Sequence, residues 1–137
     1  MSAANLFENL KKLKLPEGKY AIFGSGPMCV RGLRECRDLD VIITEDIFVE
    51  YSKKPEWKTQ KYNTTFYLEN EGIEIWKDWA PDYMPNVWDI ERLIAAADII
   101  NDLPFVKLEE VLKWKKALRR EKDLKDIKLI EDYLKRN

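Results

Sequence analysis

Two aspartates separated by one residue, Asp38 and Asp40, open an apolar run that continues as Val41-Ile42-Ile43. Residues i and i+2 of a β-strand point to the same side, so both carboxylates would share one face. Carboxylates held side by side repel each other unless a proton or a cation lies between them, and aspartate is depleted in strands. The pair therefore indicates a metal site; the alternative is a charged strand end that faces solvent.

A glycine-rich turn, Gly24-Ser25-Gly26, follows another apolar run upstream of the aspartates. Where such a turn opens a helix, its backbone N–H groups can bind a phosphate. Cys29 occupies the third glycine position of a Rossmann fingerprint, and the chain has no Gly-Lys-Ser/Thr of a Walker A loop. The turn and the aspartate pair together predict a site for a metal-bound nucleoside triphosphate, although the turn alone could be a simple strand-to-helix connection.

Three arginines lie between these two motifs: Arg31, Arg34 and Arg37. A guanidinium binds either a carboxylate or a phosphate through two parallel hydrogen bonds. These side chains could therefore pair with the aspartates or reach phosphate oxygens, and the sequence leaves both roles open.

A third carboxylate, Glu74, lies in the run Gly72–Trp76, on the opposite strand face from Ile73 and Ile75. It would join the aspartate pair if its strand neighbours the strand of Asp40. Taken by itself, Glu74 is an ordinary strand glutamate that faces solvent.

The composition restricts the chemistry further. The chain has 137 residues, enough for one domain with a buried core, and it has no histidine, which excludes a Ser-His-Asp triad, a Cys-His pair and histidine metal ligands. Acid–base chemistry would fall to carboxylates, lysines, tyrosines or a metal ion. A formal net charge of −1 argues against a general polyanion binder. Because neither a signal pattern nor an apolar run of ~18 residues occurs, we expect a soluble, cytoplasmic protein.

Two cysteines, Cys29 and Cys36, flank the basic segment. If residues 28–34 are helical, the two cysteines lie about two turns apart, too far for an easy disulfide. The absence of histidine and of further cysteines argues against a zinc site, so we expect two reduced, half-buried thiols.

The spacing of apolar residues and the positions of turn residues predict the helices and strands that must position these side chains. Together they predict an α+β domain, with a small mixed β-sheet and helices packed on it. Strands are expected at 19–23, 39–44, 63–68 and 72–76, the last two as a hairpin. Helices are expected at 3–14, 28–33, 45–53, 89–97, 108–118 and 123–134. Residues 96–100 could instead form a short edge strand. Residues 78–88 are expected as an irregular loop.

This loop carries three aromatic residues, Trp79, Tyr83 and Trp88. Large aromatic side chains of this kind usually fill a core or an interface, and a dimer interface is one option here. The alternative is that they line a pocket for a second substrate. We favour the role in the core or at an interface.

The segment FGSGPMCVRGLRECRDLDVII resembles the signature of the nucleotidyltransferase superfamily, which has the polymerase-β-like fold. In that signature, Gly-Ser ends a strand, a helical turn follows, Asp-x-Asp lies on the next strand, and a later carboxylate lies on a neighbouring strand. Gly24-Ser25 and Asp38-x-Asp40 match this pattern in type and order. Glu74 is the best match to the third carboxylate, where aspartate is more usual.

A second segment, from Trp114 to Ile127, is similar to a C-terminal region of small members of this superfamily. There, a helix with a lysine, here Lys115, precedes Arg-x-Lys-Asp, here with Lys122, and a final helix. The alternative is a plain helix–turn–helix in which Asp123 is the N-cap and the charges are solvated.

The resemblance implies a nucleotidyltransferase-like fold in one domain (1–137), with the nucleotide- and metal-binding core at 1–80 and C-terminal helices at 89–137. It implies that Asp38 and Asp40 hold Mg²⁺ (or Mn²⁺) on an NTP, while Glu74 completes a second metal site or deprotonates an acceptor hydroxyl. The residues implied in phosphate binding are Gly24, Ser25, Gly26, Arg34, Arg37, Lys115 and Lys122. The acceptor could be a small molecule, an RNA or a protein.

The main alternative is a non-catalytic nucleotide-binding or regulatory module, because the chain is small and has no separate acceptor domain. Similar small domains occur as one half of toxin–antitoxin pairs, so a partner protein or a homodimer could complete the unit. A Rossmann-type NAD binder is a third option, which the broken glycine pattern disfavours.

Overall fold

The computed structural model of the protein describes residues 3–79 and 88–137. The described strands are β1 (Tyr20–Phe23), β2 (Leu39–Ile43), β3 (Lys58–Tyr62), β4 (Thr65–Asn70), β5 (Ile73–Trp76), β6 (Asp98–Ile100) and β7 (Leu103–Phe105). The described helices are α1 (Ala3–Lys12), α2 (Gly26–Cys29), α3 (Glu45–Ser52), α4 (Ile90–Ala95), α5 (Leu108–Leu118) and α6 (Glu121–Arg136). The fold is therefore mixed α+β, as the sequence predicts.

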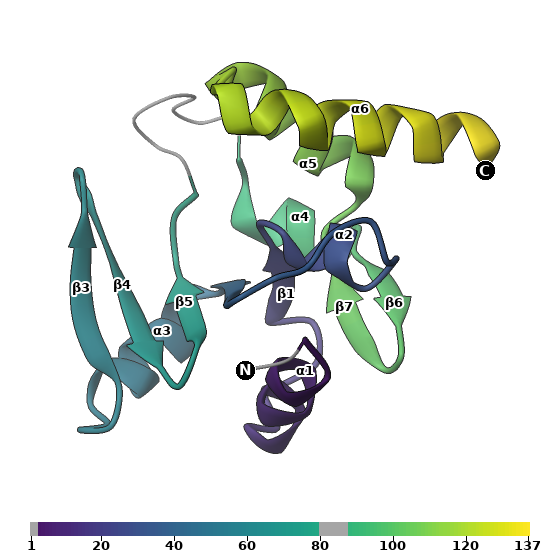
Figure 1. Ribbon diagram of the computed structural model, residues 1–137. Coiled ribbons are helices and arrows are strands. Elements are labelled where there is room, and N and C mark those ends of the chain that lie inside the picture. The colour runs from purple at the N-terminus through teal and green to yellow at the C-terminus, as the bar shows by residue number, and fades with distance from the viewer. Residues whose placement is uncertain (1–2, 80–87) are drawn as a thin grey trace.

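All seven described strands form one mixed sheet in the order β3-β4-β5-β2-β1-β7-β6. Strand β2 runs antiparallel to β1 on one side and parallel to β5 on the other. In Figure 1, α5 and α6 lie at the top of the view and α1 at the bottom, with the central strands between them. Within the described residues, none of the helices has the length and apolar character needed to cross a membrane.

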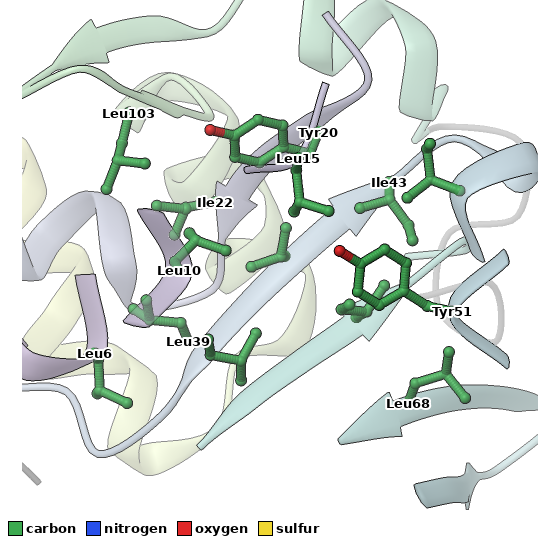
Figure 2. Close-up of a cluster of buried hydrophobic side chains, with 14 of the residues drawn as sticks. Leu6, Leu10, Leu15, Tyr20, Ile22, Leu39, Ile43, Tyr51, Leu68 and Leu103 are labelled. Atoms are coloured by element: carbon green, nitrogen blue, oxygen red, sulfur yellow. The ribbon is translucent and has the colours of Figure 1, made fainter. Parts of the chain in front are cut away.

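The two faces of the central strands are buried in two different cores. One core joins α1 and α3 to the sheet, and Figure 2 shows Leu10 of α1 beside Ile22 and Leu39 of the central strands, with Tyr51 of α3 further along the sheet. The other core contains residues of α4, α5 and α6, together with Phe23 of β1 and Ile42 of β2. Burial on both faces explains why β1 and most of β2 read as uninterrupted apolar runs.

Most of the expected elements are present with small shifts of their ends. Helix α5 has the expected bounds, α6 begins at Glu121 rather than at 123, and α4 ends before β6, so the edge strand proposed as an alternative at 96–100 is present. The predicted hairpin is confirmed as the antiparallel pair β4–β5. Its two-residue loop, Glu71-Gly72, has positive φ at both positions (48° and 83°), as a type I′ turn requires.

Two strands have no counterpart in the sequence prediction. All five residues of β3 are exposed, so no apolar alternation marks it, and it exists as the antiparallel partner of β4. Strand β7 has three residues and contains Pro104. Most of the expected irregular loop, residues 80–87, lies outside the described residues.

The prediction for the cysteines is wrong. Helix α2 ends at Cys29 instead of continuing to 33, and the chain turns at Gly32, whose φ is 73°. The two cysteines are joined by a disulfide, with their Cα atoms 6.0 Å apart. The expected separation assumed a continuous helix, and the turn removes it.

Candidate active site

The pairing of β2 with β5 brings the three predicted carboxylates together. In this parallel pair, Asp40 lies directly opposite Glu74, so the condition set for Glu74, a strand next to that of Asp40, is met. The flanking residues Leu39 and Ile73 point into the core beneath α1 and α3, which leaves both carboxylates on the other face. One carboxylate oxygen each from Asp38, Asp40 and Glu74 lies within 4.8 Å of the others.

Burial and mutual repulsion make this cluster prone to bind a proton or a cation. Burial is the largest cause that raises the pKa of Asp40 well above its ordinary value, followed by the charges of Glu74 and Asp38. Burial is also the largest cause of the raised pKa of Glu74. The indole Nε1 of Trp76 opposes the shift at Asp40 by donating a hydrogen bond of 3.2 Å to its Oδ1. A divalent cation would relieve the repulsion that remains.

The glycine turn packs directly against the cluster. Gly24 has a φ of +62°, and a Cβ built on it would lie 2.3 Å from Oδ2 of Asp40. A Cβ on Gly26 would lie 2.2 Å from Cγ2 of Ile22, so the turn sits tightly on β1 as well. A side chain at either position would collide with its neighbour, so both positions need glycine. Gly24 also has a backbone conformation that favours glycine. Ser25, at the N-cap of α2, is half-buried and lies at the edge of the same site.

A large open cleft, about 1390 Å³ in volume, adjoins the carboxylates on the side of the glycine turn. Gly24, Ser25, Asp38 and Asp40 line it on the sheet side, and the first turns of α6 line the opposite side. Three exposed cations also line the cleft: Arg37, Lys122 and Lys125. Within residues 3–79 and 88–137, none of these three forms an ion pair, so their charges face the cleft without a carboxylate partner.

A buried charge network forms the wall of the cleft. Lys115 is only 4% exposed, and its Nζ lies 3.0 Å from Asp126 and 3.5 Å from Asp123. The two aspartates also bind arginines, since Arg34 donates to Asp126 at 2.6 Å and Arg120 to Asp123 at 2.7 Å. The structure thus places two of the expected phosphate ligands, Arg34 and Lys115, in ion pairs with carboxylates.

The alternative drawn from the sequence for this segment, with Asp123 as the N-cap and the charges solvated, is only partly right: charges such as Lys122 are exposed, but Asp123 is not the N-cap and is buried with Lys115 and Asp126. Arg120 is the N-cap of α6, and Asp123 is the third helical residue, 1% exposed, which accepts a hydrogen bond from the Arg120 backbone N–H. Although burial acts to raise it, the pKa of Asp123 is held below its ordinary value by the hydrogen bonds from Arg120 and the charge of Lys115. This network joins α5, α6 and, through Arg34, the loop before Asp38.

The remaining expected residues lie outside the carboxylate cluster. Arg31 donates to the carbonyl of Pro27 and pairs with Asp98 of β6. Trp79 and Trp88 are buried against Phe23, with the Trp79 ring stacked on it at 4.4 Å, so both belong to the core. Tyr83 lies outside the described residues.

The sequence analysis did not predict that two aromatic side chains, Trp76 and Tyr67, lie beside the carboxylates. The Trp76 ring, beside Asp40, stacks on Tyr67 of β4 at 4.2 Å. Trp76 follows Glu74 by two residues, so strand periodicity could have placed it on the face of the carboxylates. The contribution of Tyr67 depends on the register of the β4–β5 pair and has no such local signal.

The sequence matches no protein-family model and no characterised protein.

Proposed function

We propose that the protein is a Mg²⁺-dependent nucleotidyltransferase that moves a nucleoside monophosphate from an NTP to an acceptor hydroxyl. The observation that carries the proposal is the convergence of Asp38, Asp40 and Glu74 within 4.8 Å beside a glycine turn. Carboxylates beside a glycine turn combine oxygen ligands for a divalent cation with backbone N–H groups for a phosphate, as metal-assisted phosphoryl transfer uses.

The donor set suits a hard cation. Mg²⁺ and Mn²⁺ prefer oxygen ligands, and Asp38, Asp40 and Glu74 offer three carboxylates without nitrogen or sulfur competitors. When bound, the ion would supply charge neutralisation and polarisation of the phosphoryl group at the α-phosphate. The close fit of Gly24 against Asp40 holds that carboxylate in place for this role.

The cleft supports the rest of the assignment. Backbone N–H groups at Gly24–Gly26 and the Ser25 hydroxyl would bind the β- and γ-phosphates. Arg37 and Lys122, which line the cleft without carboxylate partners among the described residues, would neutralise phosphate charge. Arg34 and Lys115 would act mainly by holding the cleft wall, because aspartates occupy their cationic groups.

The transfer itself needs one base and one leaving group. The acceptor hydroxyl oxygen attacks the α-phosphorus, and a new P–O bond forms as the bond to the β-phosphate oxygen breaks. Pyrophosphate leaves with the electron pair of that bond, and Glu74, when it does not itself bind a second metal ion, takes the proton of the hydroxyl. Glu74 suits this step because burial raises its pKa above that of an ordinary glutamate, which makes it a stronger base.

Calorimetric titration with each NTP, with and without Mg²⁺, tests the proposal. The wild type should bind at least one NTP only with Mg²⁺, and Asp38→Asn should weaken that binding roughly 10- to 100-fold. Glu69→Gln is the control, since Glu69 lies opposite Glu74 in the β4–β5 pair but is not one of the three clustered carboxylates. An absence of Mg²⁺-dependent binding in the wild type would refute the proposal.

A measurement of pyrophosphate release then distinguishes an active nucleotidyltransferase from a non-catalytic nucleotide-binding module. NTP binding without pyrophosphate release on any hydroxyl acceptor would favour the non-catalytic nucleotide-binding or regulatory module, including a partner protein of the toxin–antitoxin type.

A further inference from the structure

Strand β3 forms one edge of the sheet. It pairs with β4 on its inner side, no described strand pairs with its outer side, and Figure 1 shows it at the left end of the sheet. The pairing runs without a bulge from Lys58 to Tyr62, and the strand contains no proline. Natural sheets usually protect an edge with a bulge, a proline, a very short strand or a covering segment. Of these devices, the short strand is found only at the opposite edge, where β6 has three residues.

The outer side of β3 offers backbone hydrogen-bonding groups. Tyr62 and Thr65 flank a two-residue loop, and residues in this position hydrogen-bond to each other. Hydrogen-bonded and non-hydrogen-bonded pairs alternate along two antiparallel strands, so Thr59 and Lys61 direct their N–H and C=O groups away from β4. Both residues are exposed. An added antiparallel strand would therefore exchange backbone hydrogen bonds with Thr59 and Lys61.

This edge is basic, although the chain as a whole is not. Residues 53–62 contain four lysines and one glutamate, whereas the net charge of the chain is −1. Lys58 and Lys61 are exposed and lie on opposite faces of β3. Neither forms an ion pair within the part of the chain that the structure describes; the Nζ of Lys61 lies 5.9 Å from the centre of the Phe66 ring. A strand that approaches this edge thus meets two positive charges, one on each face.

These charges restrict the kind of partner. Lysines on an edge strand deter a second basic edge, because like charges on paired strands repel, so they disfavour a second copy of β3. Phosphates of a nucleic acid would suit the lysines, but they would meet the outward carbonyl groups of Thr59 and Lys61 as well as their N–H groups. An acidic polypeptide strand matches both the charges and the alternating donors and acceptors of the backbone.

We propose that the outer edge of β3 binds an extended acidic segment of a partner protein, which adds to the sheet as an antiparallel strand. Its backbone pairs with Thr59 and Lys61. Two carboxylates, three residues apart and on opposite faces of the added strand, lie opposite Lys58 and Lys61. Backbone hydrogen bonds supply affinity in this mode of recognition, and the side chains supply specificity. The interaction does not depend on the proposed nucleotidyl transfer, whose carboxylates lie on β2 and β5 and in the loop before β2.

Fluorescence anisotropy with the dye-labelled peptide Thr-Glu-Thr-Val-Glu-Thr tests the role of charge. The wild type should bind it, and the double variant Lys58→Glu/Lys61→Glu should weaken binding on the order of 10-fold. Added salt should also weaken binding by the wild type, because the charges are exposed. Lys12→Glu/Lys135→Glu is the matched control, since it changes the net charge equally at two exposed lysines of α1 and α6. It should bind like the wild type.

The variant Thr59→Pro tests the backbone pairing. Proline removes the outward N–H of β3, and an edge strand accepts it where that N–H faces solvent. Binding should fall roughly 3- to 10-fold, as expected for a lost hydrogen bond. Thr59→Val keeps the N–H and should bind like the wild type. Unfolding curves in urea check that each variant is folded.

Several outcomes would overturn the proposal. The peptide could fail to bind, the same peptide with glutamine in place of both glutamates could bind as tightly, or the two charge variants could bind alike. A single-stranded oligonucleotide that displaces the peptide and binds more tightly would assign the edge to a nucleic acid. A wild-type dimer in sedimentation that Thr59→Pro converts to a monomer would assign it to a second copy. None of these measurements involves an NTP, so they leave the test of the proposed function separate.

Discussion

The indole Nε1 of Trp76 donates a hydrogen bond to Oδ1 of Asp40 across 3.2 Å, from the strand β5 to the neighbouring strand β2. Burial and the two neighbouring carboxylates raise the pKa of Asp40, whereas this hydrogen bond favours its ionised form. Trp76 therefore positions Asp40 and prepares it to bind a cation.

Replacing Trp76 with Phe should keep most of the ring stacking and remove the donor. The pKa of Asp40 should rise further, so Mg²⁺ affinity, measured by titration calorimetry across pH, should fall on the order of tenfold and shift its profile to higher pH. Trp57→Phe, which packs on Tyr51 in the opposite core, is the control and should leave the profile in place. Equal profiles for both variants would contradict a positioning role.

Replacing Gly24 with Ala should disable the site more than it destabilises the fold. The added Cβ would collide with Asp40, so Mg²⁺-dependent NTP binding should fall roughly 10- to 100-fold. Gly32→Ala is a close control, because Gly32 also has positive φ (+73°) but open space around its Cβ position. Both variants should lose about 1–2 kcal/mol of stability from backbone strain. NTP binding that falls equally in both would show that strain, not the clash, is responsible.

The metal-free protein should lose stability as pH rises above the ordinary carboxyl range. Burial and the neighbouring charges give Asp40 a higher pKa in the folded state, so the folded protein binds more protons than the unfolded chain. The free energy of unfolding, measured with urea, should thus decrease from pH 3.8 upward until Asp40 is ionised. Mg²⁺ or the substitution Asp40→Asn should flatten this decrease.

The pKa of Asp123 is shifted in the opposite direction, so this residue changes the free energy of unfolding in a different pH range. Its pKa is lowered by Arg120 and Lys115 against the effect of burial, so its contribution is lost only as pH falls below 3.8. A metal-free protein whose stability rose between pH 4 and neutrality would contradict the assignment to Asp40.

Replacing Lys115 with Met should destabilise the protein strongly. It leaves Asp123 and Asp126 buried without their shared cation, at a cost of about 3–5 kcal/mol in the free energy of unfolding. Lys116→Met is the matched control, since the Lys116–Glu131 pair is exposed and should contribute no more than about 1 kcal/mol. Urea unfolding curves of the two variants give the difference. Similar midpoints would show that the network is not a structural support.

Reducing the disulfide between Cys29 and Cys36 should destabilise the fold by roughly 2–3 kcal/mol, the chain-entropy value for so short a loop. Unfolding curves with and without dithiothreitol measure this, and the double variant Cys29→Ala/Cys36→Ala should be insensitive to the reductant. Labelling of the denatured, unreduced protein with iodoacetamide is the direct check. Modification of either cysteine there would refute the disulfide.

Local chemistry in the sequence was enough for several features. The shared face of Asp38 and Asp40 follows from the two-residue period of a strand, and the bounds of α5 follow from helical spacing. The β4–β5 hairpin follows from turn residues around Gly72. Each depends on interactions between residues that are close in sequence, so each can be inferred without knowing the partner elements.

Tertiary structure alone decided the rest. Glu74 faces Asp40 because the apolar sides of β2 and β5 are buried together beneath α1 and α3, which sets a parallel register across a long connection. The burial of Lys115 between two aspartates depends on how α5 packs against α6. Strand β3 has no apolar pattern and exists through its pairing with β4. The sequence by itself thus determined which residues could bind a metal and a phosphate, and packing between distant segments decided which of them meet.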